Sequence, residues 1–373
     1  MDFELNDLEK ILQSAAWDFA RKEVQPLAAE VDRSGEFPLA LVKRMGELGY
    51  LGLPYPRSYG GAGAGYIGYT LVIEQVCRCS ATVGAIIAVS SLFQESLFRF
   101  GNETQKLRYL VPAASGNSLA CFAFTEPDTG SDPKAITTVA RQSNSGYLVT
   151  GQKNFISLSP VAQFSLVFAR DETGLVSAFI IDASDSRFVI QEACQTIGLR
   201  GLGTSMIYLD SIPVNGDDLL GEKGRGYEIL LEAISLERVG VSAESVGIAQ
   251  AALDLSVDYA RQRIAYGKSI AKMPTIQWLL AEMDSRLEAA RWLTYRVAWL
   301  RDRGLDIRKE SSEAKLFASQ AAVDVTRMAM QVHGAYGTMK SLPVERLYRD
   351  AKMVEVYVGV SEIQRVIIAS SLM

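Results

Sequence analysis

Two short segments in the middle of the chain carry side chains suited to holding a polar ligand. The first reads FAFTEPDTGSD and runs from Phe122 to Asp132. An apolar stretch that leads into Thr-Glu-Pro and then Gly-Ser places hydroxyl groups and free backbone N–H groups at one turn. Such a turn suits the polar edge of a cofactor or a phosphate group.

The second segment, NFISL, covers residues 154–158 and contains Phe155 and Ser157 two positions apart. Side chains two apart on a strand share a face, so we expect an aromatic ring and a hydroxyl to face one ligand. Ordinary turn and strand packing explains each segment equally well when it is taken alone.

Other kinds of chemistry have little support in the sequence. The single histidine, His333, would have to take part in any Ser-His or Cys-His pair, which removes many hydrolase mechanisms. Four cysteines in 373 residues do not make a disulfide framework, and one Cys-x-Cys without nearby histidine is a weak metal signal, so we predict no metal site. The glycine-rich GEKGRGY at 221–227 lacks the spacing of a phosphate loop and predicts a bend between strand and helix.

The charge balance and the N-terminus bear on partners and location. There are 38 basic and 43 acidic residues, a net charge of -5 without long runs of one sign, which argues against nucleic acid as the main partner. The N-terminus has no basic stretch followed by a continuous apolar one, and no apolar run reaches about 18 residues. We therefore expect a cytoplasmic protein without a membrane segment.

The periodicity of apolar residues divides the chain into three blocks. It is helical from Leu8 to about Asn117, and two buried helices are expected within residues 69–101. From about Leu119 to Val214 it has the period of short strands, which predicts a small antiparallel barrel or sandwich. Four long helices are then predicted over residues 227–263, 276–303, 309–333 and 343 to about 371. Segregated blocks of this kind indicate an α+β fold, and no Rossmann fingerprint is present.

The two middle segments, together with ARQRIAYGK (260–268), QVHGAYG (331–337), ERLYRDAK (345–352) and GVSEIQR (359–365), resemble the acyl-CoA dehydrogenase family in order and spacing over essentially the whole chain. The resemblance implies an N-terminal helical domain at 1–118, a middle antiparallel β-barrel at 119–225 and a C-terminal four-helix bundle at 226–373. It also implies a homotetramer with one FAD per subunit.

The resemblance further assigns ligand contacts. Flavin contacts are expected from Phe122, Thr125, Gly130, Ser131, Phe155, Ile156 and Ser157. Contacts with the rest of the cofactor, partly across a subunit boundary, are expected from Arg263, Tyr266, Gln331, Gly334, Ala335 and Glu362. A bond from Arg263 to phosphate is physically apt, and His333 then lies in a cofactor-binding loop and not at a proton-transfer position.

Contacts with the substrate are expected from Ser131, Arg238, Tyr357 and Gly359. Arg238 could equally be an exposed helix residue paired with Glu237.

Desaturation of an acyl thioester needs a base, and the usual one is missing. In most of the family a glutamate directly follows the tyrosine of the C-terminal motif, where this chain has Val358 after Tyr357. Glu237 stands where branched-chain and long-chain members supply their base, so the resemblance implies Glu237 as base and the Val358 N–H as donor to the thioester oxygen. Glu244, seven residues further on the same helix face, is a second candidate or a group that supports Glu237.

The predicted function is FAD-dependent α,β-desaturation of acyl-CoA, with a branched or cyclic acyl group favoured and an electron-transfer flavoprotein as acceptor. An oxidase acting on acyl groups tethered to an acyl carrier protein, a flavin monooxygenase of the same fold, and a silent binding protein are the alternatives. Departures from the family pattern at Phe155, Pro274 and Val360 indicate altered cofactor contacts.

Overall fold

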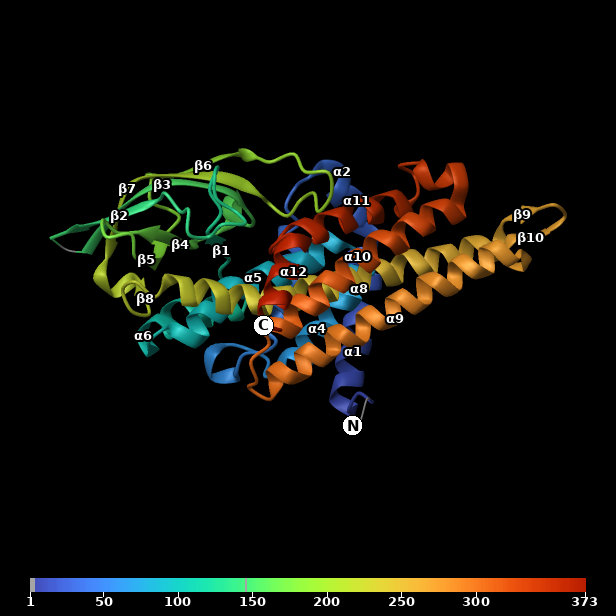
Figure 1. The fold of residues 1–373 in the computed structure, drawn as a ribbon, viewed down its shortest axis with the longest axis horizontal. Coiled ribbons are helices and arrows are strands. Elements are labelled where there is room, and N and C mark those ends of the chain that lie inside the picture. The colour runs from blue at the N-terminus through green and yellow to red at the C-terminus, as the bar shows by residue number, and fades with distance from the viewer. Residues whose placement is uncertain (1–3, 145) are drawn as a thin grey trace.

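The computed structural model describes residues 4–144 and 146–373, and its first third is helical (Figure 1). Both α4 and α5 are buried along most of their length, which confirms the two buried helices predicted within residues 69–101. Ser80 begins α5 by accepting the N–H of Val83 on its side chain. The helices are α1 Asp7–Phe19, α2 Ala28–Ser34, α3 Leu39–Glu47, α4 Gly65–Cys77, α5 Ala81–Phe100, α6 Glu103–Gln105 and α7 Val111–Ala114.

By length and composition α5 could cross a membrane, but 89% of its apolar window is buried inside the molecule. It lies between β1 and the long helix α8 and forms part of the central core. Its apolar surface is therefore explained by packing within the fold.

The middle of the chain forms one eight-stranded sheet in the order β6-β7-β3-β2-β4-β5-β8, with β1 beside β4. Most pairs are antiparallel as predicted, while β1 and β2 pair with β4 in parallel. β4 and β5 have five consecutive buried residues each, so the sheet is covered on both faces there. The strands are β1 Ala120–Ala123, β2 Val139–Ser143, β3 Gly146–Ile156, β4 Phe164–Arg170, β5 Val176–Asp182, β6 Phe188–Ala193, β7 Ser205–Asn215 and β8 Leu219–Leu220.

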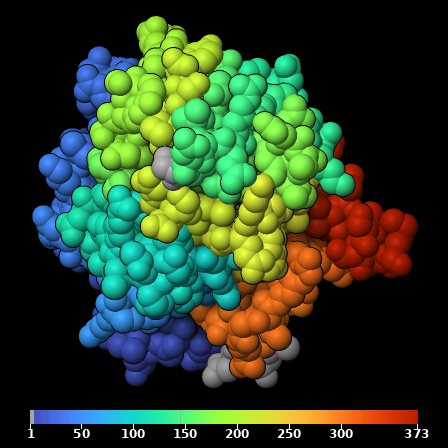
Figure 2. Space-filling model, turned by 90° about the vertical axis from the view of Figure 1, so that its left-hand side faces the viewer, coloured from blue at the N-terminus to red at the C-terminus, as the bar shows by residue number. Residues whose placement is uncertain are grey.

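The C-terminal third is a helical bundle built around α8, which packs on α10, α9, α5 and α4. In Figure 1, α8 runs from beneath the sheet to the small β9–β10 hairpin at the opposite end of the molecule. In Figure 2 the red C-terminal residues project from one side of the body. The elements are α8 Gly226–Gln262, β9 Ile264–Ala265, β10 Lys268–Ser269, α9 Pro274–Asp302, α10 Arg308–His333, α11 Pro343–Val356 and α12 Ser361–Ser370.

The prediction of one continuous helix at the C-terminal end of the chain is wrong. Instead of one helix from 343 to about 371, α11 and α12 are separated by a turn over residues 357–360. Val358 has φ 56° and Gly359 has φ 91°, and neither value is compatible with a continuing right-handed helix. The α+β class with helical blocks on either side of a sheet domain is confirmed.

Candidate active site

Glu237 lies in the fourth turn of α8 and is fully buried. Its Oε2 accepts a hydrogen bond from Ser91 Oγ of α5 at 3.1 Å, and the Tyr69 hydroxyl of α4 lies 3.1 Å from the same Oγ. Its Oε1 has no partner within residues 4–144 and 146–373. Burial, followed by the nearby carboxylate of Glu244, raises the pKa of Glu237 well above its usual range.

Glu244, two turns further along α8, is also fully buried. Its Oε2 accepts a hydrogen bond of 2.5 Å from the hydroxyl of Tyr357. Burial raises the pKa of Glu244 to about 8 even though this bond favours the ionised form. Burial and the two carboxylates of Glu244 and Glu237 raise the pKa of Tyr357, so this ring lies close to both acids.

The turn after Tyr357 holds the backbone in a conformation that is costly for its residues. Val358 is β-branched, and a positive φ is a genuine outlier for such a side chain. Its N–H donates to no acceptor among the residues that the structure describes. A free N–H in the residue after Tyr357, whose hydroxyl contacts the buried Glu244, is the kind of group that can hold a developing oxyanion.

Arg238 is only 5% exposed, its Nε has no partner, and it makes no ion pair with any described residue. The alternative that it is an exposed residue paired with Glu237 is therefore wrong. Burial lowers the pKa of Arg238 to about 10, and its charge in turn lowers the pKa of Lys315 on α10. Arg238 therefore lies near Lys315, which contacts the turn at 357–360.

Polar atoms without partners gather in this part of the molecule. Such atoms are rare in folded proteins and indicate function or a missing ligand. Within the described chain, the buried atoms that lack a partner here belong to Glu237, Arg238, Glu244, Ser361 and Gln364.

The two segments predicted to hold the flavin are joined to each other. The backbone N–H of Asn154 donates to the carbonyl of Thr125 at 2.8 Å. Behind Thr125, Lys153 is fully buried and donates to Glu126 at 2.8 Å and to the carbonyls of Phe124 and Phe168. This buried ion pair fixes the end of β1 to β3.

Phe155 does not follow the simple strand alternation that we expected. It has φ 57° within a register shift of the β3–β7 pair, and its ring is 65% exposed. Ile156 is buried, so only its backbone is available to a ligand, and Ser157 is half-buried with its hydroxyl 3.4 Å from that of Thr204. An aromatic ring is nevertheless held out from the sheet, next to the polar turn.

These segments lie close to the acids through α5. Phe122 packs against a cluster that includes Phe93 and Leu97 of α5 and Leu230 of α8. Phe93 is two residues after Ser91, and Leu230 is two turns before Glu237. At Gly130 a Cβ would meet no atom within 4 Å, so the turn faces open space, and both Gly130 and Ser131 are exposed. An open polar turn beside an exposed ring fits the edge and face of a flavin.

The remaining predicted cofactor residues, apart from Glu362, meet at the other end of the bundle, whereas Glu362 lies in the first turn of α12, next to the turn at 357–360. The guanidinium of Arg263 lies 5.8 Å from the ring centre of Tyr336, so the segments at 263–266 and 331–335 are neighbours. At 1.5 Å per residue, Arg263 is about 39 Å from Glu237 along α8. Tyr266, Gln331, Gly334, Ala335 and Glu362 are exposed.

His333 has a structural environment. Its ring stacks on Tyr259 at 4.3 Å, Nδ1 lies 2.8 Å from the carbonyl of Ala329, and burial lowers its pKa. These contacts hold the ring at the end of α10, far from the acids.

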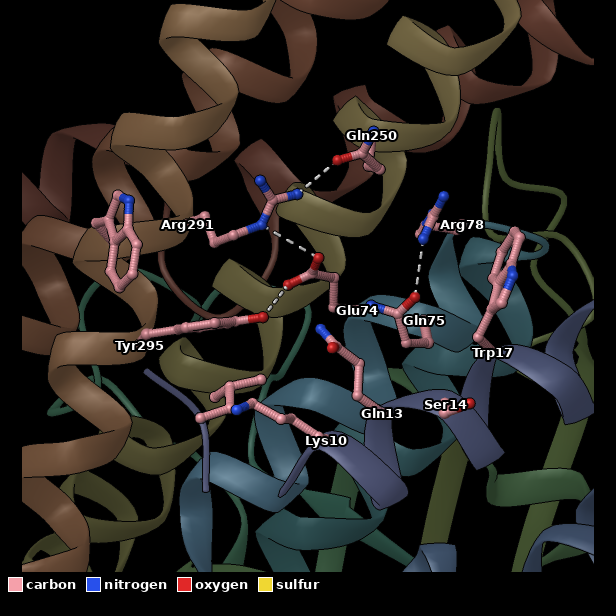
Figure 3. Close-up of a pocket in the computed structure, with 12 residues that line it drawn as sticks. Lys10, Gln13, Ser14, Trp17, Glu74, Gln75, Arg78, Gln250, Arg291 and Tyr295 are labelled. Carbon is pink, nitrogen blue, oxygen red and sulfur yellow. Dashed lines mark hydrogen bonds and ion pairs between the residues drawn. The ribbon is translucent and has the colours of Figure 1, made fainter. Parts of the chain in front are cut away.

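A separate polar cleft of about 460 Å³ lies between α1, α4, α8 and α9 (Figure 3). Its charged groups are already paired: Arg291 with Glu74 at 3.2 Å and with Gln250 at 2.6 Å, and Tyr295 with Glu74 at 2.7 Å. Gln250 is thirteen residues beyond Glu237, about 20 Å along α8. The cleft is therefore distinct from the cluster of acids.

Sequence reasoning missed four side chains that the structure places at the acids or the turn: Tyr69, Ser91, Lys315 and Gln364. Tyr69 and Ser91 lie in apolar helices where no local pattern marks them. Lys315 had a usable signal, because it is the lone charged residue in the stretch AKLFASQAA of α10.

Comparison with known proteins agrees with this geometry. Family models match three parts of the chain: the acyl-CoA dehydrogenase N-terminal domain at residues 6–117, the middle domain at 121–212 and the C-terminal domain at 224–373. The chain is 43% identical to an acyl-CoA dehydrogenase of Bacillus subtilis over 361 residues, with 95% of each chain covered.

Solved structures agree as well. Butyryl-CoA dehydrogenase from Megasphaera elsdenii is similar with a TM-score of 0.98 at 32% identity, covering 100% of both chains. The prolyl acyl carrier protein oxidase AnaB gives 0.96 at 28%, covering 99% of this chain and 100% of its own. An FAD complex of PigA gives 0.95 at 27%, covering 100% and 99%.

The open turn, the exposed ring and the buried acids agree with the family that these comparisons identify. This chain belongs to the acyl-CoA dehydrogenase family and is an FAD-dependent oxidoreductase acting on CH–CH bonds.

Proposed function

We propose that this protein desaturates an acyl-CoA thioester with Glu237 as the base. The observation that carries the proposal is the fully buried Glu237 with an unpartnered Oε1, whose charge raises the pKa of Tyr357, the residue directly before the free N–H of Val358. The α-carbon of a thioester is a weak acid, and a carboxylate with a raised pKa is a stronger base for it.

The proposed reaction divides between the two groups. The α-proton moves to Oε1 of Glu237, while the β-carbon loses a hydride and the C=C bond forms between the two carbons. When bound, FAD supplies the acceptor for that hydride. The negative charge that develops on the thioester oxygen is stabilised by the N–H of Val358.

The binding residues form two sets, one for the flavin and one for the thioester substrate. Phe122, Thr125, Gly130, Ser131, Phe155, Ile156 and Ser157 would contact the flavin, the last two partly through their backbone. Ser131, Arg238, Tyr357 and Gly359 would contact the thioester and its carrier. Neutral Glu244 would hold Tyr357, because two ionised carboxylates in one apolar region repel each other.

Assembly belongs to the proposal because one copy does not bring every cofactor residue together. Arg263, Tyr266, Gln331, Gly334 and Ala335 would bind the remainder of the FAD of a second copy, and Glu362 would contact the cofactor from beside the turn at 357–360. Exposed apolar side chains at that end, including Ile264, Tyr266 and Tyr336, support such an interface within a homotetramer. We further propose domains at 1–118, 119–225 and 226–373, a cytoplasmic location and an electron-transfer flavoprotein as acceptor.

The acyl group is proposed to be branched or cyclic, since the base is on α8 and not at position 358. A second candidate is oxidation of an acyl group tethered to a carrier protein, which the similarity to AnaB favours. Rates with matched CoA and carrier-protein thioesters separate the two.

The function is tested by mixing the holoenzyme anaerobically with straight, branched and cyclic acyl-CoA thioesters and following the loss of flavin absorbance. Bleaching with at least one thioester, with the matching enoyl product, is expected. A yellow protein that no acyl thioester bleaches refutes the proposal.

A further inference from the structure

The turn at residues 357–360 is held in place from three directions. Its conformation is unfavourable for Val358, and such conformations persist only where the surroundings impose them. The structure identifies these surroundings as one side chain each from α8, α10 and α12.

Lys315 of α10 makes the most direct contact. It is fully buried, and its Nζ donates to the carbonyl of Glu355 at 2.9 Å and to that of Gly359 at 2.8 Å. One acceptor precedes Val358 and the other follows it, so the amine bridges the turn. Two N–H groups serve two acceptors, and the bridge therefore forms with the neutral amine as well as with the ammonium.

Gln364 of α12 adds a second bond to the same place. Its Nε2 donates to the carbonyl of Gly359 at 2.8 Å. A Cβ at Gly359 would approach this Nε2 to 2.7 Å, so the side chain closes tightly over the backbone. From α8, Glu244 accepts the hydrogen bond of the Tyr357 hydroxyl.

The position of Lys315 is costly for stability alone. Burial, followed by the charge of Arg238, lowers the pKa of Lys315 to about 7. A buried amine beside another cation is a poor choice for packing, since an apolar side chain would avoid both penalties. Lys315 donates both of its hydrogen bonds to carbonyl groups on either side of Val358.

We propose that Lys315 and Gln364 are positioning residues that orient the N–H of Val358 toward the thioester oxygen. This inference rests on the proposed role of that N–H. An oxyanion donor acts only when it is held about 2.7–3.1 Å from the oxygen, and a misplacement of 1 Å can cost about 10²-fold in rate. In this proposal Lys315 and Gln364 do not touch the reacting atoms, and their whole effect passes through the backbone of the turn.

The test compares the Lys315→Met holoenzyme with a matched control, Gln105→Leu. Gln105 is also buried and also donates to two backbone carbonyls, of Asp217 at 2.8 Å and of Leu219 at 2.9 Å, but it lies on α6 away from the turn. Both variants lose a buried donor that bridges two carbonyls. Only the first loses it next to Val358.

Three measurements are made on each holoenzyme. Calorimetry gives the affinity for an acyl-CoA thioester and for the thioether analogue that lacks the carbonyl oxygen. Hydrogen exchange gives the protection of the amides at 357–360. Anaerobic bleaching gives the rate of reduction. Lys315→Met is expected to lose at least tenfold of the preference for thioester over thioether, to exchange faster at the turn, and to bleach roughly ten- to hundredfold more slowly.

Gln105→Leu is expected to match the wild type in all three measurements. If Lys315→Met does not fold, Gln364→Leu provides the same comparison with a smaller effect. An unchanged thioester preference in the folded variant overturns the proposal, as does a wild type that shows no such preference. A wild type with the preference that bleaches with no thioester refutes the proposed desaturation and leaves the positioning role standing.

Discussion

Replacement of Glu237 by glutamine tests the base without disturbing its surroundings. Glutamine has nearly the same shape, and its carbonyl oxygen can accept the hydrogen bond that Ser91 donates at 3.1 Å. The amide nitrogen would take the place of Oε1, which has no partner in the described chain, at a stability cost of about 1–3 kcal/mol. A large loss of rate in a folded variant therefore reports the loss of the base.

Removing a positioned base costs about 10²–10⁴ in rate, or about 3–5 kcal/mol of barrier at 1.36 kcal/mol per tenfold. The assay is anaerobic stopped-flow bleaching of the flavin by a thioester that reduces the wild type. Glu237→Gln should remain yellow and bind the thioester normally while bleaching that much more slowly. The wild-type rate should rise with pH as Glu237 loses its proton, and this rise should be absent from the variant.

The matched control is Glu244→Gln, which changes the other buried acid of the same helix. Its bond to Tyr357 can be kept by the amide oxygen, so we expect a loss of less than about tenfold, below the effect of removing a base. Bleaching by Glu237→Gln within threefold of the wild type, with a large loss in Glu244→Gln, would assign the base to Glu244 and refute the reasoning.

Three further outcomes are expected. The pKa of Glu244 is raised from 4.5 to about 8, so its contribution to stability is complete below pH 4.5 and is lost as pH rises through 8. This contribution amounts to about 5 kcal/mol at most. In urea unfolding from pH 5 to 8.5, the free energy of unfolding should therefore decline less steeply in Glu244→Gln than in the wild type. Lys153→Met leaves the buried carboxylate of Glu126 without its cation and should lower the free energy of unfolding by about 3–5 kcal/mol. Most of this loss should be recovered in the double variant that also carries Glu126→Gln. Equal losses in the single and the double variant would contradict an ion-pair effect. Adding Val358→Glu to Glu237→Gln should raise the bleaching rate at least tenfold, because this change places a carboxylate at the usual family position. Glutamate is not β-branched and tolerates the positive φ of this position better than valine. No recovery of the rate would show that the turn cannot present an acid.

The sequence predicted those features that arise from local patterns. Helical and strand periodicity predicted the three blocks and the two buried helices α4 and α5. The reason is that a buried face of a helix or strand requires apolar residues at regular spacing in the sequence. The seven-residue spacing of Glu237 and Glu244 placed both on one side of α8, and both are buried there.

The break at 357–360 could not be predicted in the same way. The stretch VYVGV is apolar and continues a helical pattern, and Gly359 is its single local signal. Of the three side chains that hold the turn, only Gln364 is local, whereas Glu244 and Lys315 are more than forty residues away from the residues Tyr357 and Gly359 that they contact. Tyr69 and Ser91 escaped prediction for the same reason, since only the packing of α4 and α5 on α8 gives them a carboxylate to contact.

The placement of α5 has a consequence for synthesis of the protein. Its partner α8 begins about 126 residues after α5 ends, so at roughly 5–20 residues per second the ribosome needs about 6–25 s to supply it. During that interval a helix apolar enough to pass for a membrane span lacks the surface that later covers it. The nascent chain is therefore most prone to aggregation or chaperone capture while the sheet domain is being made. Slowing translation between residues 100 and 226 should lower the yield of folded protein more than slowing it after residue 262.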